Sequence, residues 1–366
     1  MIPYIDLTAK LRKQKRRSVQ ALERVMSHGQ YINGVEVESF ESAFANFTGL
    51  KFFSGVSSGT AALYLALKAR NIGPGDEVIT TPLSYLASTS AISLTGATAV
   101  LCDIDDTLCL NSKEVKKSIN KNTKAVILVH LYGNIGSVNE IKQLCQDENI
   151  ALIEDCAQAN GSSINGKLAG TFGDFGCLSF HPLKTLAAMG DAGGLCCREK
   201  KIDTWVKSAR NHGHNGRDDA TFWSHNLRID ALQAAFLCVQ LDYYDQTLLA
   251  RSEQANFYLN EFEDIICRGH IKVPKKAKNV FHSYNMFVIL LSDRAKFIKY
   301  MFKNGIEVKV HYPYTIDELT ASSSLVVTKD IKKARNASNQ IVSLPIGPHI
   351  SKNDIKYISK TVLNFF

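Results

Sequence analysis

The chain has 366 residues, of which 45% are hydrophobic and 21% are charged, and its formal net charge is +8 at pH 7. These proportions are typical of a globular protein with a full hydrophobic core, and they exclude collagen-like, coiled-coil and disordered chains. Apolar stretches such as residues 125–130 have the length of a strand and fall far short of the ~20 residues that a membrane helix needs. We therefore expect a soluble protein without a membrane partner.

The N-terminal segment carries charge early and continues into a basic run, which is the reverse of the order in an export signal. Its basic residues are Lys10, Arg12, Lys13, Arg16 and Arg17. Apolar residues are interspersed with them, so they are interpreted as the solvent face of an amphipathic helix rather than as a nucleic-acid patch. We expect no nucleic-acid partner.

The nine cysteines are odd in number, lack CxxC spacing and in several cases sit within apolar runs. This usage is typical of reduced core thiols in a cytoplasmic protein and argues against a disulfide framework or a zinc site. The pair His212 and His214 has no carboxylate nearby in the sequence and is interpreted as part of a surface loop. We expect no metal.

Short apolar runs alternate with helical patterns in the first part of the chain, which predicts an α/β fold. Seven strands are predicted, over residues 51–55, 77–81, 98–103, 125–130, 151–155, 175–180 and 193–197. Helices over 58–67 and 138–148 lie between strands, as βαβ crossovers do, so the sheet is expected to be mostly parallel.

A helical stretch over residues 229–262 leads into a smaller α+β unit. In this unit we predict strands over 284–291 and 306–311 and helices over 295–304 and 355–366. The expected domains are residues 1–245 and 246–366.

The segment around Lys184 is the most informative about chemistry. Lys184 follows a predicted strand and precedes a stretch with Gly190, Gly193 and Gly194 that returns into the next strand. A lysine amine at a strand end can form a Schiff base with an aldehyde cofactor if its surroundings lower its pKa. The alternative is an ordinary solvated loop lysine.

Asp155 ends the predicted strand 151–155, and Gln158 follows three residues later. Ligands of mostly parallel sheets bind at the carboxyl ends of the strands, and a carboxylate there can keep a pyridine nitrogen protonated. The alternative is a cap for the following turn. Because Glu154 lies on the opposite face of the strand, only one of the two carboxylates is expected in the site.

Ser57-Ser58-Gly59-Thr60 opens a predicted helix directly after a strand, and free N–H groups at a helix start favour a phosphate. The alternative is a simple helix cap. Ser179 adds a hydroxyl at the strand before Lys184, and Tyr85 offers a ring for stacking unless it is a core tyrosine.

Four motifs in this order resemble the DegT/DnrJ/EryC1/StrS family of sugar aminotransferases. They are Ser58-Gly-Thr-Ala-Ala-Leu, Glu154-Asp-Cys-Ala-Gln, Ser179-Phe-x-x-x-Lys184 with Gly190-Asp-x-Gly, and His225-Asn-Leu-Arg228 running into Asp230-Ala-Leu-Gln. The similarity extends from Tyr31 to His349. It implies a fold-type-I aminotransferase with a mostly parallel seven-stranded sheet between helices and a smaller C-terminal α+β domain.

The resemblance also implies the cofactor, pyridoxal 5'-phosphate, and the residues that hold it. Lys184 would bind the cofactor covalently and shuttle the proton, Asp155 would pair with the ring nitrogen, and Gln158 would lie near the ring hydroxyl. Tyr85 would stack on the ring. Gly59, Thr60 and Ser179 would hold the phosphate together with Asn226 of a neighbouring subunit, which implies a homodimer with shared active sites.

The implied reaction moves an amino group from L-glutamate to a keto group of a nucleotide-linked deoxy sugar, in polysaccharide or secondary-metabolite synthesis. His181, His311 and Tyr312 would contact this substrate, with a locally bonded loop histidine as the alternative for His181. Arg228 and Arg210 are candidate partners of its diphosphate, because a guanidinium binds phosphate bidentately, with ordinary surface ion pairs as the alternative. Asp191 in place of the more common glutamate resembles enzymes of 3-keto sugars. Alternative functions are transamination of another cyclic ketone, such as a keto-inositol, and a non-catalytic ligand-binding or scaffolding role.

Overall fold

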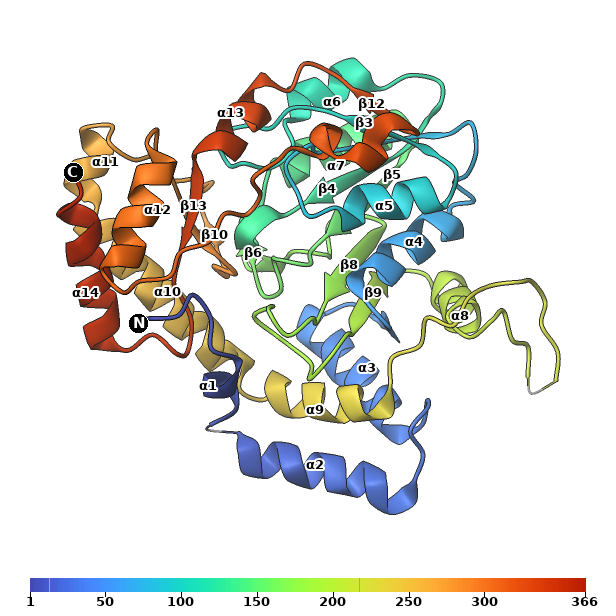
Figure 1. Cartoon of the computed structure of the whole chain (residues 1–366). Coiled ribbons are helices and arrows are strands. Elements are labelled where there is room, and N and C mark those ends of the chain that lie inside the picture. Colours follow the sequence, from blue (N-terminus) through green and yellow to red (C-terminus); the bar gives the residue numbers. More distant parts are fainter. Residues whose placement is uncertain (13, 217) are drawn as a thin grey trace.

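The computed structural model describes residues 1–12, 14–216 and 218–366 (Figure 1). Lys13 of the basic run lies outside the described residues. Lys10 lies in α1 (Leu7–Leu11), Arg12 directly follows this helix, and Arg16 and Arg17 lie in α2 (Lys15–His28). α2 buries Ala21 and Val25 while Arg16 and Arg17 stay exposed. The amphipathic interpretation is therefore confirmed for α2.

The main sheet has eight strands, and six neighbouring strands of it run parallel to one another. The spatial order of all eight is β1 (Phe52–Val56), β9 (Gly193–Cys197), β8 (Phe175–Ser179), β5 (Ala151–Asp155), β4 (Thr123–Val129), β2 (Glu77–Thr80), β3 (Thr98–Leu101) and β12 (Val326–Thr328). Only β9 runs antiparallel to both its neighbours, β1 and β8. The mostly parallel sheet predicted from the sequence is confirmed.

The predicted strand count of seven is one too low. All seven predicted strands are present, and β12 adds an eighth at the edge, parallel to β3. This strand has three residues and is largely exposed, so it lacks the buried apolar run by which the others are recognised.

Helices cover both faces of the sheet, as Figure 1 shows. Those of the large unit that follow α2 are α3 (Val35–Thr48), α4 (Gly59–Ala69), α5 (Ala87–Leu94), α6 (Ser112–Ser118), α7 (Val138–Asp147), α8 (Lys200–Ala209) and α9 (Ala231–Leu241). Alternate residues of β4 point to opposite faces, with Val126 and Leu128 in the core formed with α3, α7 and α9 and Ile127 in the core formed with α4 and α5. This alternation on two apolar faces explains the nearly continuous hydrophobic strands.

The remaining elements form the C-terminal unit and two small sheets. They are α10 (Tyr244–Glu261), α11 (Glu263–Cys267), α12 (Arg294–Lys303), α13 (Lys332–Gln340) and α14 (Lys352–Leu363), the pair β11 (Phe287–Leu290) and β13 (Ile341–Leu344), and the sheet of β10 (Val280–Phe281), β6 (Ser163–Ile164) and β7 (Lys167–Leu168). A separate core packs β11 and β13 against α10, α12 and α14. The division at residue 245 stays a prediction.

Two strand predictions in this unit need correction. Residues 306–311 form no strand, because Ile306 pairs singly with Ile2 of the N-terminal segment and Lys309 singly with Ser343. The strand predicted over 284–291 begins only at Phe287, since the positive φ of Tyr284 (46°) interrupts the extended backbone before it.

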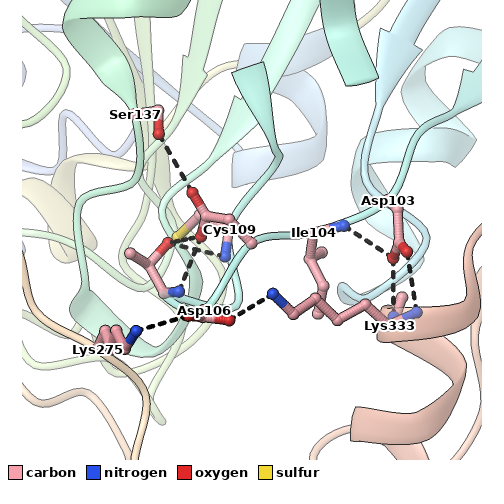
Figure 2. A network of polar contacts seen from close by, with 10 residues as sticks. Asp103, Ile104, Asp106, Cys109, Ser137, Lys275 and Lys333 are labelled. Atoms are coloured by element: carbon pink, nitrogen blue, oxygen red, sulfur yellow. Dashed lines mark hydrogen bonds and ion pairs between the residues drawn. The ribbon is translucent and has the colours of Figure 1, made fainter. Parts of the chain in front are cut away.

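A network of carboxylates joins the C-terminal unit to the loop after β3 (Figure 2). Asp103 caps α13 by accepting the N–H groups of Lys333 (2.9 Å) and Ala334 (2.8 Å). Asp106 pairs with Lys275 (2.8 Å) and with the ammonium group of Lys333, and these two lysines lower the pKa of Asp106 to about 2. The loop thereby fixes α13 against the edge of the main sheet.

Among the described residues, none of the helices combines the length and the apolar character required to cross a membrane. All nine cysteines are free thiols and seven of them are buried, as the sequence predicts.

Candidate active site

A cavity of about 510 Å³ lies where β5 and β8 end and α4 begins. All but two of the predicted site residues line it: Gly59, Thr60, Tyr85, Asp155, Gln158, Ser179, His181, Lys184, His311 and Tyr312. Residues from positions 59 to 312 thus meet at one edge of the sheet, the edge where parallel strands present their carboxyl ends.

Lys184 lies in the turn between β8 and β9, and its main-chain N–H donates to the His181 carbonyl oxygen (2.8 Å). Burial lowers the pKa of the Lys184 ammonium from 10.5 to about 8, and the Asp155 carboxylate opposes this shift. The opposition requires that the two groups lie within electrostatic range in the same cavity. A lysine with this pKa has an appreciable neutral, nucleophilic fraction near neutral pH.

Asp155 is held at the end of β5 by two hydrogen bonds. The Ser88 hydroxyl donates to Oδ2 (2.8 Å) and the Ala157 N–H donates to Oδ1 (3.1 Å). Sequence reasoning missed Ser88, which lies in the first turn of α5, three residues after Tyr85. Its closeness in the sequence to a predicted site residue was the available signal.

Glu154 points to the other face of β5, as the alternation of strand side chains predicts. It accepts the N–H groups of Gly170 (2.9 Å), Phe172 (2.7 Å) and Gly173 (2.7 Å) and contacts His130 Nε2 (2.9 Å). Burial acts to raise the pKa of Glu154, but these bonds outweigh it and the pKa is lowered.

The same carboxylate belongs to a buried group with His130 and Cys156 that has the composition of a metal site. Both Glu154 oxygens already accept hydrogen bonds, and burial raises the pKa of the Cys156 thiol well above its usual value. A protonated thiol and a saturated carboxylate are poor metal ligands. We interpret this group as a structural anchor for the loop 170–173.

The start of α4 forms a close-packed cradle against β8 and β9. Ser58 caps the helix by accepting the Ala61 N–H (3.1 Å), and an added Cβ on Gly193 would lie 2.3 Å from the Ser58 carbonyl carbon. An added Cβ on Gly59 would lie 2.9 Å from Ser179 Cβ. Glycine at both positions therefore lets the helix start approach Ser179, and the first N–H groups of a helix favour a phosphate.

The opposite wall joins the cavity to the C-terminal unit. Gln158 Nε2 donates to the Tyr312 hydroxyl (2.9 Å), and Gln158 Oε1 accepts the Tyr132 N–H (2.8 Å). Tyr85 lies 6.1 Å from Tyr312 between ring centroids and is 53% exposed, so it is not a core tyrosine. Burial, Lys184 and Lys309 lower the pKa of His311 to about 4, which leaves it neutral at physiological pH.

These residues fit pyridoxal phosphate at each of its chemical groups. The amine of Lys184 suits the aldehyde, the fixed Asp155 carboxylate suits the ring nitrogen, and the glycine-lined helix start with Ser179 suits the phosphate. The exposed ring of Tyr85 supplies a stacking face.

Asn226 and Arg228 are the two predicted site residues that do not line the cavity of this chain. Asn226 is exposed and pairs through its main chain with Asn211, while the Arg228 guanidinium donates to the Asn211 side chain. Arg210, which the sequence suggested as a phosphate partner, forms a buried ion pair with Glu41 instead.

Comparison with known proteins agrees with the cofactor site described above. The family model described as DegT/DnrJ/EryC1/StrS aminotransferase family matches residues 12–363. The chain is 34% identical over 99% of its length to the dTDP-3-amino-3,6-dideoxy-α-D-galactopyranose transaminase of Aneurinibacillus thermoaerophilus, of which 99% is covered. It is 30% identical to the UDP-2-acetamido-2-deoxy-3-oxo-D-glucuronate aminotransferase of Pseudomonas aeruginosa, with both chains covered completely.

Among solved structures, S. venezuelae DesV in complex with a ketimine intermediate superimposes with a TM-score of 0.96 and 30% identity. The match covers 100% of this chain and 98% of that one. The chain belongs to the DegT/DnrJ/EryC1/StrS aminotransferase family and is a fold-type-I, pyridoxal-phosphate-dependent aminotransferase.

Proposed function

We propose that this enzyme transfers an amino group from L-glutamate to the C3 keto group of a nucleotide-linked deoxy sugar. The observation that carries the proposal is the joint placement of Lys184 and Asp155 on one cavity, next to a helix start suited to phosphate. The nucleotide-sugar class is supported by the names of the relatives, of which the Aneurinibacillus enzyme makes a 3-amino sugar and the Pseudomonas enzyme acts on a 3-oxo sugar.

When bound, pyridoxal phosphate supplies an electron sink for the carbon that exchanges the amino group. Lys184 would anchor the cofactor and then, once displaced by the donor, carry the proton between donor carbon and cofactor carbon. Its pKa of about 8 suits a group that both accepts and returns a proton near neutral pH. Asp155 would keep the ring nitrogen protonated, held for this by Ser88 and the Ala157 N–H.

Gly59, Thr60 and Ser179 would hold the phosphate, Tyr85 would cover the ring and Gln158 would lie beside the ring hydroxyl. On the acceptor side, Asp191 is an exposed carboxylate on the cavity wall. Its resemblance to the aspartate of enzymes of 3-keto sugars supports the C3 position. We assign substrate contacts to His181, His311 and Tyr312 in the same cavity, and to Arg228 across a subunit boundary.

A homodimer with shared sites explains the position of Asn226 outside the cavity of its own chain. The segment that carries it follows α8 and extends away from the body of the chain (Figure 1). Trp223 in this segment is 95% exposed, while its neighbour Phe222 stacks on Trp205 of α8 at 5.5 Å. A fully exposed tryptophan on an anchored loop favours burial by a second copy, which would bring Asn226 to the partner's phosphate. The free thiols support a reducing, cytoplasmic location.

The substrate proposal is tested with purified enzyme, pyridoxal phosphate, L-glutamate and matched 3-keto and 4-keto deoxy sugars linked to dTDP, UDP or GDP. We expect formation of a 3-amino sugar, identified by mass spectrometry and NMR, and no product with Lys184→Ala. Product from the 4-keto sugars alone would contradict the assigned position, and product from a keto-inositol alone would contradict the substrate class.

The dimer proposal is tested by mixing Lys184→Ala and Asn226→Ala, each of which we expect to lose activity by itself. Random exchange makes half of the dimers mixed, and each mixed dimer has one intact site, so about a quarter of the wild-type activity should return. Absence of any recovery after subunit exchange, verified by native mass spectrometry, would contradict sharing of the site.

A further inference from the structure

A second, smaller cavity of about 170 Å³ adjoins the first, and the two share Leu183, Asn285, Met286 and His311 as lining residues. The rest of its wall comes from four separate parts of the chain, represented by Tyr4 near the N-terminus, Arg251 of α10, Lys309 before His311 and His349 after β13.

Arg251 gives this cavity a buried positive charge. It is 7% exposed, and its Nε and Nη2 donate to the main-chain oxygens of Tyr284 (2.9 Å) and Asn285 (3.0 Å). Within the described ranges 1–12, 14–216 and 218–366, it forms no ion pair. Burial lowers the pKa of Arg251 to about 10, so the guanidinium stays charged at neutral pH. A buried cation without a counter-charge is costly until an anion joins it.

The other charged groups of the wall do not supply that anion. The ammonium group of Lys309 is paired with Glu307 (2.6 Å), and Asp6 Oδ1 accepts the Thr8 N–H (2.9 Å) as the cap of α1. Burial lowers the pKa of both His311 and His349, which favours their neutral forms. Among the described residues, no carboxylate of the wall therefore pairs with the Arg251 guanidinium.

Asn285 is a second unsatisfied group in the same place. It is 5% exposed, and neither Nδ2 nor Oδ1 has a hydrogen-bond partner in the part of the chain that the structure describes, although the side chain lines both cavities. A buried amide of this kind is expected to meet a ligand. Gly347 keeps the space open, because an added Cβ there would lie 2.8 Å from Arg251 Nη1.

We propose that this second cavity binds the side-chain carboxylate of a dicarboxylic amino donor, with Arg251 as counter-ion and Asn285 as hydrogen-bond donor. The volume accommodates a carboxylate with a short methylene chain, since a water molecule takes about 30 Å³, but not a nucleotide diphosphate. The adjoining first cavity contains Lys184, where the amine-bearing carbon must react. The inference rests on the proposed function and gives a reason for glutamate as donor.

The test uses the first half-reaction alone, without sugar. Its progress is monitored by the loss of the absorbance of the lysine-bound cofactor. L-Glutamine serves as the neutral isostere of L-glutamate. We compare wild type with Asn285→Asp, which places a negative charge on the cavity wall, and with Arg251→Lys. The matched control is Arg294→Lys, because Arg294 also donates to a main-chain oxygen, that of Ser338, but lines neither cavity.

Wild type should prefer glutamate over glutamine, and Asn285→Asp should reduce this preference by about tenfold to a hundredfold, as expected for loss of a bond to a charged group. Arg294→Lys should leave it unchanged. Glutarate should raise the melting temperature of the wild-type holoenzyme more than butyrate does, and Asn285→Asp should lose this difference while remaining folded.

An unchanged glutamate preference in Asn285→Asp, or an altered KM for the sugar with normal donor kinetics, would overturn the inference. Arg251→Lys gives a second, independent measurement of the preference for glutamate over glutamine, provided that its melting temperature is close to that of the wild type. Because the half-reaction needs no acceptor, failure of every nucleotide sugar would count against the proposed function and leave the donor result standing.

Discussion

Capture of pyridoxal phosphate by the cofactor-free enzyme should follow the titration of Lys184, because only the neutral amine attacks an aldehyde. Burial lowers the pKa of this lysine from 10.5 to about 8, while Asp155 opposes the shift. The rate should therefore rise with pH and level off above about pH 8. Asp155→Asn removes the opposing charge and should move the midpoint to lower pH.

The size of the effect follows from the two pKa values. At pH 7 an amine with a pKa of about 8 is about 9% neutral, whereas one with a pKa of 10.5 is about 0.03% neutral. The cavity thus raises the reactive fraction about 300-fold relative to a lysine in water.

The assay mixes cofactor-free enzyme with pyridoxal phosphate in a stopped-flow instrument from about pH 6 to about pH 10 and follows the absorbance of the bound cofactor. A parallel series with a free alkylamine corrects for the titration of the cofactor itself. A rate that keeps rising without a bend up to about pH 10 would refute the reasoning, since Lys184 would then behave as a solvated lysine.

Three further predictions concern the scaffold. Asp103→Ala removes the cap of α13 and should lower the free energy of unfolding by about 1 kcal/mol in urea titrations, whereas Asp103→Asn keeps one of the two acceptor oxygens and should retain about half of this contribution. Asp106→Asn should cost only about 0.5 kcal/mol at pH 7, because its ion pairs are exposed. Folding depresses the pKa of Asp106 from 3.8 to about 2, so this contribution is present above pH 3.8 and should vanish as the pH falls towards 2. A difference in the free energy of unfolding between variant and wild type that stays constant over that range would contradict the prediction. Gly193→Ala brings a Cβ to 2.3 Å from the Ser58 backbone and should weaken cofactor binding at least tenfold by fluorescence titration, while Gly190→Ala, whose Cβ meets only the flexible Gln233 side chain at 3.2 Å, should bind normally.

Local patterns in the sequence predicted most of the sheet and the cofactor side of the cavity. The strand 151–155 was placed correctly because it is wholly apolar up to the two carboxylates that end it, and its alternation correctly separated Asp155 from Glu154. The resemblance added the family and the order of the motifs, which the family model confirms.

What the sequence did not predict depends on contacts between distant segments. Nothing near Arg251 or Asn285 shows that the two residues meet around a cavity that also contains Tyr4 and His349. The edge strand β12 is too short and exposed for a periodicity argument, and the bridge from Ile306 to Ile2 links opposite ends of the chain. Chain folding, not local propensity, creates these features.

The most direct measurement of the central claim is the position of the covalent link between protein and cofactor. Borohydride reduction of the loaded enzyme, followed by digestion and mass spectrometry, should find the pyridoxyl group on the peptide that contains Lys184, and Lys184→Ala should yield no labelled peptide. A label on another lysine in the wild type, or undiminished labelling of Lys184→Ala, would contradict the account.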